Sequence, residues 1–123
     1  MASQLLNVGL SLKASNINGL LTLNKSVDAA LTYNDQDVTT DTITVAHGSA
    51  TELITTGAGA DIYVYLKNTD TVNKLKTQTS GNVNYGHINP GDFSFYCVKE
   101  GEGLKVQATT ADIVLEYITF KKA

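Results

Sequence analysis

The chain has 123 residues, of which 42% are hydrophobic and 17% charged, and its formal net charge is −3. This length suits one domain, residues 1–123, that can bury a core without cross-links. The nine basic residues are all lysine. Arginine is the preferred partner of phosphates and guanine edges, so its absence argues against a nucleic-acid partner.

The N-terminal segment predicts a β-hairpin. Apolar residues alternate with small or polar ones from Val8 to Leu12, which is the pattern of a strand with one apolar face. Asn18 and Gly19 suit a tight hairpin turn, and residues 20–24 would form the returning strand. Residues 1–26 therefore predict an N-terminal hairpin, or equally an arm used in assembly with another subunit. The candidate interface residues of this segment are Leu5 and Leu6.

Three further strands are predicted before the middle of the chain. Residues 27–33 alternate weakly between apolar and polar positions, and residues 34–37, Asn-Asp-Gln-Asp, predict a loop. Residues 42–46 and 51–55 are rich in threonine and branched aliphatic residues, which favours strands. The Gly-Ala-Gly segment at 57–59 predicts a break before the next strand.

The second half of the chain predicts a run of short strands. These are residues 60–68, 73–78, 85–88, 93–98, 104–108 and 113–120. The second of them carries lysines and few apolar residues, which predicts an edge strand. Turn signals recur about every ten residues, and this spacing indicates an all-β, antiparallel sandwich or barrel.

One turn holds the only proline of the chain. Asn89, Pro90, Gly91 and Asp92 lie between two predicted strands. Proline followed by glycine at the central positions predicts a type II turn, because proline fixes the first dihedral and glycine accepts the positive one. The predicted role of this turn is structural: it sets the register between the two strands.

The titratable residues predict no catalytic, cofactor-binding or metal site, and the chain is not expected to be an enzyme. His47 and His87 lack the close spacing that a zinc site uses, and no nucleophile and acid converge on either in the sequence. The segment Pro90-Gly91-Asp92 also occurs in cupins, but the His-x-His pair that binds metal in cupins is missing.

Other polar and reactive residues are expected to be structural. Asp35, Asp37 and Asp41 do not match an EF-hand loop, because Thr40 and Ala46 stand where it needs glycine and glutamate; a solvated acidic loop is the prediction. The lone Cys97, within an apolar run, is expected to be a buried thiol.

No targeting or membrane segment is recognisable. The opening residues lack the basic and apolar regions of a secretory signal, and no segment approaches the roughly 20 apolar residues of a membrane helix. The sequence therefore leads us to expect a protein made in the cytoplasm with no membrane partner.

Two tyrosines are candidate interface residues. Tyr63 and Tyr65 fall on one face of a predicted strand, opposite its aliphatic residues. Tyrosine is enriched at protein interfaces, and a tyrosine pair can also form a carbohydrate platform. The structural alternative places both rings at the rim of the core with their hydroxyls in water.

The pattern of strands and turns resembles the small β-rich virion proteins of tailed bacteriophages, in particular capsid decoration (cement) proteins. The segments that carry the resemblance are Tyr63–Asp70, Ile88–Phe95, Leu104–Ala108, Val114–Tyr117 and, near the N-terminus, Gly19–Ser26. The resemblance spans roughly residues 19–120 and includes no catalytic motif.

The resemblance implies a jelly-roll-like β-sandwich that assembles, often as a homotrimer, on the outer surface of a virion. The implied partners are the major capsid protein and other copies of the chain, and the implied role is to bridge capsomers and stabilise the shell. Two other readings stay open: a tail, fibre or baseplate component, and a carbohydrate-binding module, although the chain lacks the tryptophan that such modules usually carry.

Overall fold

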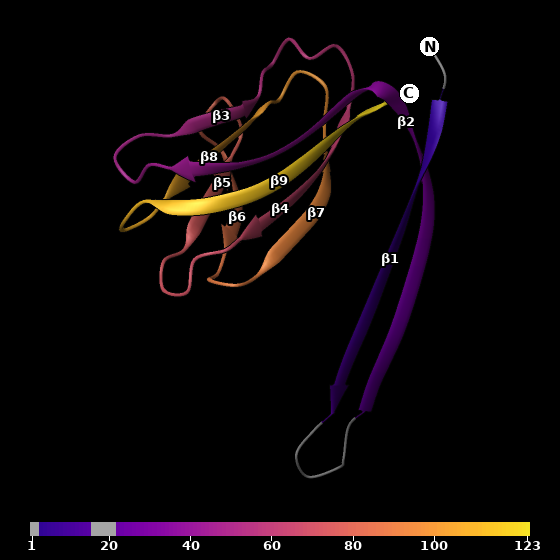
Figure 1. Ribbon diagram of the computed structural model, residues 1–123, viewed down its shortest axis with the longest axis horizontal. Helices are drawn as coiled ribbons and strands as arrows, with labels where there is room; N and C mark the ends of the chain where they lie inside the picture. Colours follow the sequence, from indigo (N-terminus) through magenta and orange to yellow (C-terminus); the bar gives the residue numbers. More distant parts are fainter. Residues whose placement is uncertain (1–2, 16–21) are drawn as a thin grey trace.

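The computed structural model describes residues 3–15 and 22–123 and shows an all-β protein built from two antiparallel sheets (Figure 1). The strands are β1 (Ser3–Ser15), β2 (Thr22–Val45), β3 (Thr51–Ile54), β4 (Ile62–Asn68), β5 (Leu75–Gln78), β6 (Asn84–Ile88), β7 (Phe93–Val98), β8 (Leu104–Ala108) and β9 (Ile113–Lys122). The second-half strands lie where the sequence predicts them, within a few residues at each end. The turn predicted at Asn18 and Gly19 lies outside the described residues.

The strand order is that of a jelly roll. One sheet has the order β1-β2-β9-β4-β7, and the other has the order β3-β8-β5-β6. With β1 set aside, four strands face four, each sheet is antiparallel, and the chain crosses between the sheets as in an eight-stranded jelly roll. The expected jelly-roll-like sandwich is therefore confirmed.

The core between the sheets is almost entirely aliphatic. In β4 the alternate residues Val64 and Leu66 point inward and are fully buried. The remaining buried apolar residues come from both sheets; they are Val45, Ile54, Leu75, Ile88, Val98, Leu104, Val106, Ala108, Ile113, Leu115 and Tyr117. Phenylalanine contributes nothing to this core, and all three phenylalanines of the chain lie elsewhere.

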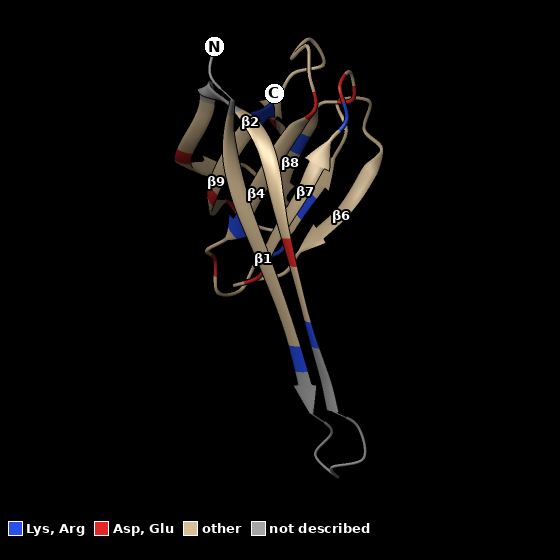
Figure 2. Ribbon diagram, turned by 90° about the vertical axis from the view of Figure 1, so that its right-hand side faces the viewer, with Lys and Arg blue, Asp and Glu red and all other residues tan. Residues whose placement is uncertain are grey.

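The N-terminal hairpin extends away from the sandwich as an arm. Strand β1 pairs with the first part of β2 in an unbroken antiparallel register from Ser3–Asn34 to Ser15–Thr22. The later part of β2, from Val38 to Val45, pairs with β9. Strand β2 thus belongs both to the N-terminal hairpin and to the sandwich. Figures 1 and 2 show the two-stranded hairpin projecting well beyond the rest of the molecule. We call β1 and residues 22–33 of β2 the arm.

The prediction of a loop at residues 34–37 is wrong. These residues lie inside β2, at an irregularity where the register shifts between Tyr33 and Val38. Polar, turn-forming residues can occupy such a bulge because one strand carries extra residues there without ending. The side chains of Asp35 and Asp37 are outside the described set.

The sequence predicts β5 at an edge, and the structure contradicts this. Strand β5 lies between β8 and β6, and Leu75 and Thr77 point into the core while Lys76 points outward. Of the two lysines that suggest an edge, Lys76 lies on the solvent face of this inner strand and Lys74 directly precedes it. Alternation, rather than edge protection, explains their positions.

The Pro90 turn joins β6 to β7 as predicted. The amide of Asp92 donates to the carbonyl of Asn89 at 3.0 Å, which closes the turn. Gly91 has a φ of 78°, the value a type II turn requires at that position. The amide of Gly91 also donates to the carbonyl of Asn68 at 3.0 Å, so the turn is fastened to the end of β4.

We expect Gly91→Val to lower the free energy of unfolding by about 1–2 kcal/mol, because a β-branched residue is strained at positive φ. Space is not the reason, since a side chain at this position would meet nothing within 4 Å. Thermal unfolding followed by circular dichroism measures the effect. An unchanged melting temperature would show that the turn tolerates another conformation.

Candidate interaction surface

The outer face of the larger sheet carries a cluster of aromatic side chains. Alternation that places Val64 and Leu66 in the core places Tyr63 and Tyr65 on the opposite face, which confirms that the two tyrosines share a face. Their neighbours in register on β7 and β9 point the same way. We call this surface the aromatic face; it consists of Tyr63, Tyr65, Phe93, Phe95, Ile118 and Phe120.

The rings of the aromatic face lie against one another. Tyr63 and Phe95 are stacked with centroids 6.3 Å apart, and Tyr65 lies 6.4 Å from Phe93. Tyr63 is only 9% exposed, whereas Phe93 remains 59% exposed. Large aromatic side chains therefore cover the outside of a sheet whose inside is aliphatic, and the other four residues of the cluster are partly exposed. Aromatic clusters on a protein surface are typical of interaction surfaces.

One side of the arm is apolar, and it continues the aromatic face. Tyr33, the last residue of the arm, packs edge-on against Phe120 with centroids 5.2 Å apart. Counting back by twos from Tyr33, and across the β1–β2 register, gives one side of the hairpin. We call it the apolar side of the arm; its apolar residues are Leu6, Val8, Leu10, Leu12, Val27, Ala29, Leu31 and Tyr33, and Gln4 and Lys25 lie on the same side at its two ends.

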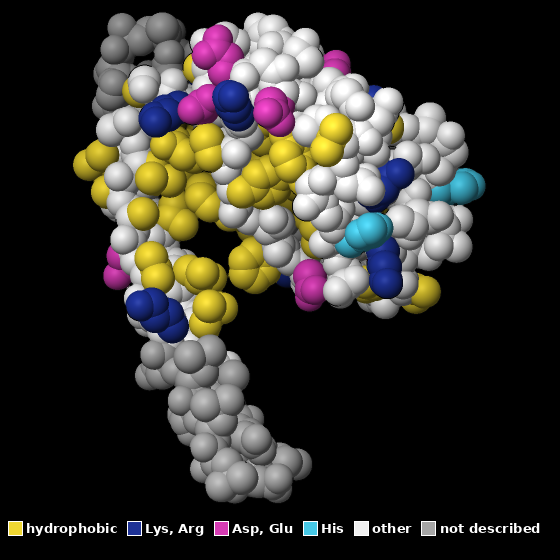
Figure 3. All heavy atoms as spheres, turned by 180° about the vertical axis from the view of Figure 1, so that it is seen from behind, with side chains coloured by type: hydrophobic (Ala, Val, Ile, Leu, Met, Phe, Trp, Pro, Cys, Tyr) yellow, Lys and Arg dark blue, Asp and Glu magenta, His cyan; other side chains and the backbone are white. Residues whose placement is uncertain are grey.

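The apolar side of the arm is open to solvent in a single chain. Leu10, Leu12 and Val27 are 43%, 48% and 49% exposed. In Figure 3 hydrophobic side chains gather both on the body and on the arm, bordering an open gap between the two. The opposite side of the hairpin carries Asn7, Ser11 and Asp28, so the arm is amphipathic.

The two leucines predicted as interface residues fall on opposite sides of the arm. Leu6 belongs to the apolar side, whereas Leu5 pairs with Thr32 on the polar side and is 62% exposed. Adjacent residues of a strand always point in opposite directions. The sequence locates the segment, but the two leucines cannot share one surface.

The prediction of a buried Cys97 is wrong. Cys97 is exposed, on the outward-facing side of β7 next to the aromatic face. The inward positions of that strand are taken by Ser94, Tyr96 and Val98, so the run Phe-Tyr-Cys-Val spans both faces. Partial desolvation, together with the charge of Asp61, raises the pKa of the thiol, which keeps it protonated at neutral pH.

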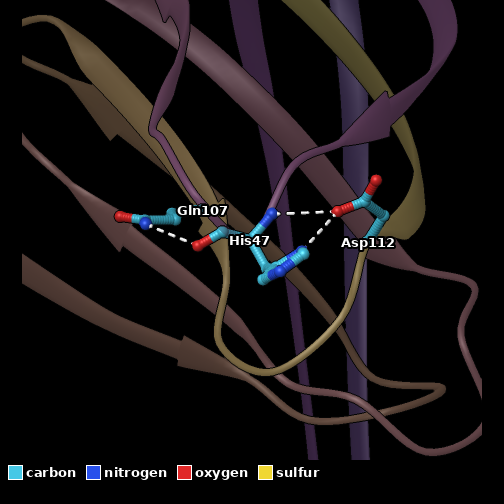
Figure 4. A network of polar contacts seen from close by, with 3 residues as sticks. All are labelled: His47, Gln107 and Asp112. Carbon is cyan, nitrogen blue, oxygen red and sulfur yellow. Dashed lines mark hydrogen bonds and ion pairs between the residues drawn. The ribbon is translucent and has the colours of Figure 1, made fainter.

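His47 takes part in a small network of polar contacts. The Nδ1 atom of His47 lies 2.6 Å from a carboxylate oxygen of Asp112, and the amide of His47 donates to the same oxygen at 3.1 Å (Figure 4). The side-chain amide of Gln107 donates to the carbonyl of His47 at 2.9 Å. These contacts connect the β2–β3 turn with the β8–β9 turn, which is a structural role. His87 lies apart on β6.

Acidic pH should weaken two turn contacts. The hydrogen bond from the His47 side chain has the largest effect on Asp112, and the bond from the His47 backbone amide has the next largest. Both hold the pKa of Asp112 below its ordinary value of 3.8. Two backbone amides, of Asn73 and then Val72, do the same for the pKa of Asp70. A carboxylate with a lowered pKa stabilises the fold above about pH 4, and this stability is lost as the pH falls through the lowered pKa.

We therefore expect the melting temperature to fall below about pH 4, and to fall less steeply in Asp112→Asn, which cannot lose a charge there. The measurement is thermal unfolding between about pH 2 and pH 5 for both proteins. Equal slopes in the two proteins would show that Asp112 has the same pKa in the folded and unfolded chains.

Another pair of tyrosines lines a hollow. Tyr85 and Tyr96, with ring centroids 5.5 Å apart, border a depression of about 230 Å³ together with Thr77, His87 and Ser94. Tyr63 and Tyr65 lie on the aromatic face instead.

Among the described side chains, no three His, Cys, Asp or Glu residues gather in a way that could hold a metal ion.

Comparisons with known proteins assign no family. No protein-family model and no curated protein matches the chain. Among solved structures, a chain described as "Bacillus endospore appendages form a novel family of disulfide-linked pili" aligns at 18% identity over 70% of this chain and 89% of its own, with a TM-score of 0.40. A likeness at this level carries no functional argument. Within residues 3–15 and 22–123, no helix is long and apolar enough to cross a membrane.

Proposed function

We propose that the chain is a structural subunit of a multi-copy assembly, specifically a bacteriophage virion protein that decorates the capsid. The observation that carries the proposal is a pair of apolar surfaces, the exposed apolar side of the arm and the partly exposed aromatic face. An isolated two-stranded hairpin is marginally stable in water, so an amphipathic arm is expected to function against a partner surface.

The choice of a virion rests on the sequence resemblance to small phage virion proteins. The jelly-roll fold is compatible with it, since viral capsid proteins use this fold, but lectins and cupins use it too. On the capsid, the protein would contact the major capsid protein where capsomers meet. Many copies on a symmetric shell give strong overall binding from small individual contacts, and binding only to the assembled shell stabilises that shell.

Co-sedimentation tests this proposal. Purified protein is mixed with capsids that lack it, and with isolated tails, and each mixture is sedimented. We expect the protein to pellet with the capsids and to raise the temperature at which they disassemble. Pelleting with tails alone would assign the chain to the tail, fibre or baseplate, and failure to pellet with either would overturn a virion role.

A further inference from the structure

The aromatic face and the apolar side of the arm match each other in chemistry. Both are rows of apolar side chains on a pleated surface, one mainly aromatic and the other aliphatic. All three phenylalanines and three of the six tyrosines of the chain lie on these two surfaces. Each copy therefore carries both halves of a contact.

The arm does not close this contact within its own chain. Strand β2 runs from the arm into the larger sheet as a single strand, held there by its pairing with β9. At its base the arm meets the sandwich, where Tyr33 packs on Phe120. Beyond that point it leaves the body (Figures 1 and 2), and Leu10, Leu12 and Val27 stay exposed.

We propose that the arm of one copy lies with its apolar side on the aromatic face of another copy. This inference rests on the assembly part of the proposed function and is independent of the capsid. Each copy gives one arm and receives one, in a reciprocal dimer or around a closed ring such as the expected trimer.

The area available fits a specific interface between copies. About nine residues at about 3.4 Å each, on two strands about 4.8 Å apart, make an arm side of roughly 30 by 10 Å. The arm would extend past the aromatic face over the rest of the outer face of the larger sheet, where β2, β9, β4 and β7 lie side by side. A reciprocal pair covers two arm sides and equal areas of two outer faces, at most about 1,200 Å² in all, which reaches the lower range of stable specific interfaces. One arm on an unrelated surface would cover about half of that.

The charges at the two surfaces do not oppose the contact. Lys25, at the end of the apolar side of the arm near its tip, is the charged residue there. On the larger sheet Glu116 points outward beside the aromatic face, with Lys67 next to it in register. The polar side of the arm, which includes Asp28, would face water in the assembly.

Two substitutions should each strongly weaken self-association. Leu10→Asp places a charge on the apolar side of the arm, and Tyr65→Asp places one in the middle of the aromatic face. Loss of one central apolar contact together with burial of a charge should raise the dissociation constant of the self-associated form at least about ten-fold. Phe93→Asp, at the exposed rim of the same face, serves if Tyr65→Asp fails to fold. The matched controls are Ser11→Asp, the next residue on the polar side of the arm, and His87→Asp on the other sheet.

Mixing the variants tests which surface meets which. Neither variant has a working arm-to-face contact with itself, but the arm of Tyr65→Asp is intact and so is the aromatic face of Leu10→Asp. We expect each variant alone to be monomeric by light scattering at concentrations where the unchanged chain associates. A 1:1 mixture at higher concentration should form a mixed dimer through its one intact arm-to-face contact, which neither variant alone forms at that concentration. The controls should associate like the unchanged chain.

Three results would overturn the inference. If arms met arms and faces met faces, each variant would still associate with itself and mixing would add nothing. A monomeric unchanged chain would show that both surfaces have another partner, and association of both variants at unchanged strength would place the interface elsewhere. All measurements use the purified protein alone, so failure to bind capsids leaves the result intact.

Discussion

Replacing Asn68 by alanine is expected to lower the free energy of unfolding by about 3 kcal/mol, since buried donors and acceptors would lose their partners. Asn68 ends β4 and is fully buried. Its side-chain amide donates to the carbonyls of Asn73 at 2.8 Å and Ile88 at 3.0 Å, and its oxygen accepts from the amide of Asp70 at 3.0 Å. Its backbone holds the Pro90 turn.

Thermal and denaturant unfolding measure this loss, and a fall in melting temperature of roughly 10 °C is expected for a domain of this size. Asn84→Ala, at an exposed position, is the control and should change stability by less than about 0.5 kcal/mol. Asn68→Asp keeps the shape but turns the donor toward two carbonyls into an acceptor, so it should cost at least as much. A nearly neutral Asn68→Asp would show that these bonds do not hold the loops together.

Replacing Gly103 by alanine is expected to cost about 3 kcal/mol, from two causes. Gly103 has a φ of 70°, where a side chain costs about 1–2 kcal/mol. A Cβ there would also lie 2.9 Å from the carbonyl oxygen of Ile54 and would collide with the side chain of Ser80, so the backbone between β7 and β8 must move.

Gly91→Ala separates the two causes. Gly91 has a similar φ of 78° but open space around it, so alanine there should cost only about 1 kcal/mol. Both variants are compared by denaturant unfolding. Equal losses would mean that the contacts with Ile54 and Ser80 relax without cost.

Local signals in the sequence locate most of the fold. The alternation of β4 and β9 and the proline-glycine turn depend on neighbouring residues only, and the structure confirms them. The continuous β2 cannot be predicted in this way, because residues 34–37 have turn chemistry. The strand continues through them because the residues before them pair with β1 and those after them pair with β9. The inner position of β5 is also set by its partners, β8 and β6.

The candidate surface is predicted from the sequence only in part. Tyr63 and Tyr65 are recognisable because two tyrosines alternate with core residues on one strand. Phe93, Phe95 and Phe120 are not, since phenylalanine in an apolar run is ordinarily assigned to the core, and the same assumption places Cys97 there wrongly. Strict alternation from the buried Val98 would have placed Phe93, Phe95 and Cys97 on the outer face.

The molar mass of the intact chain in solution tests the central claim most directly. Light scattering or sedimentation equilibrium over a range of protein concentrations would measure it. If the chain works by assembly through its arm and aromatic face, the mass is a small multiple of the monomer mass and falls to the monomer mass in Leu10→Asp. A monomer at every concentration, with no change in Leu10→Asp, would contradict the claim.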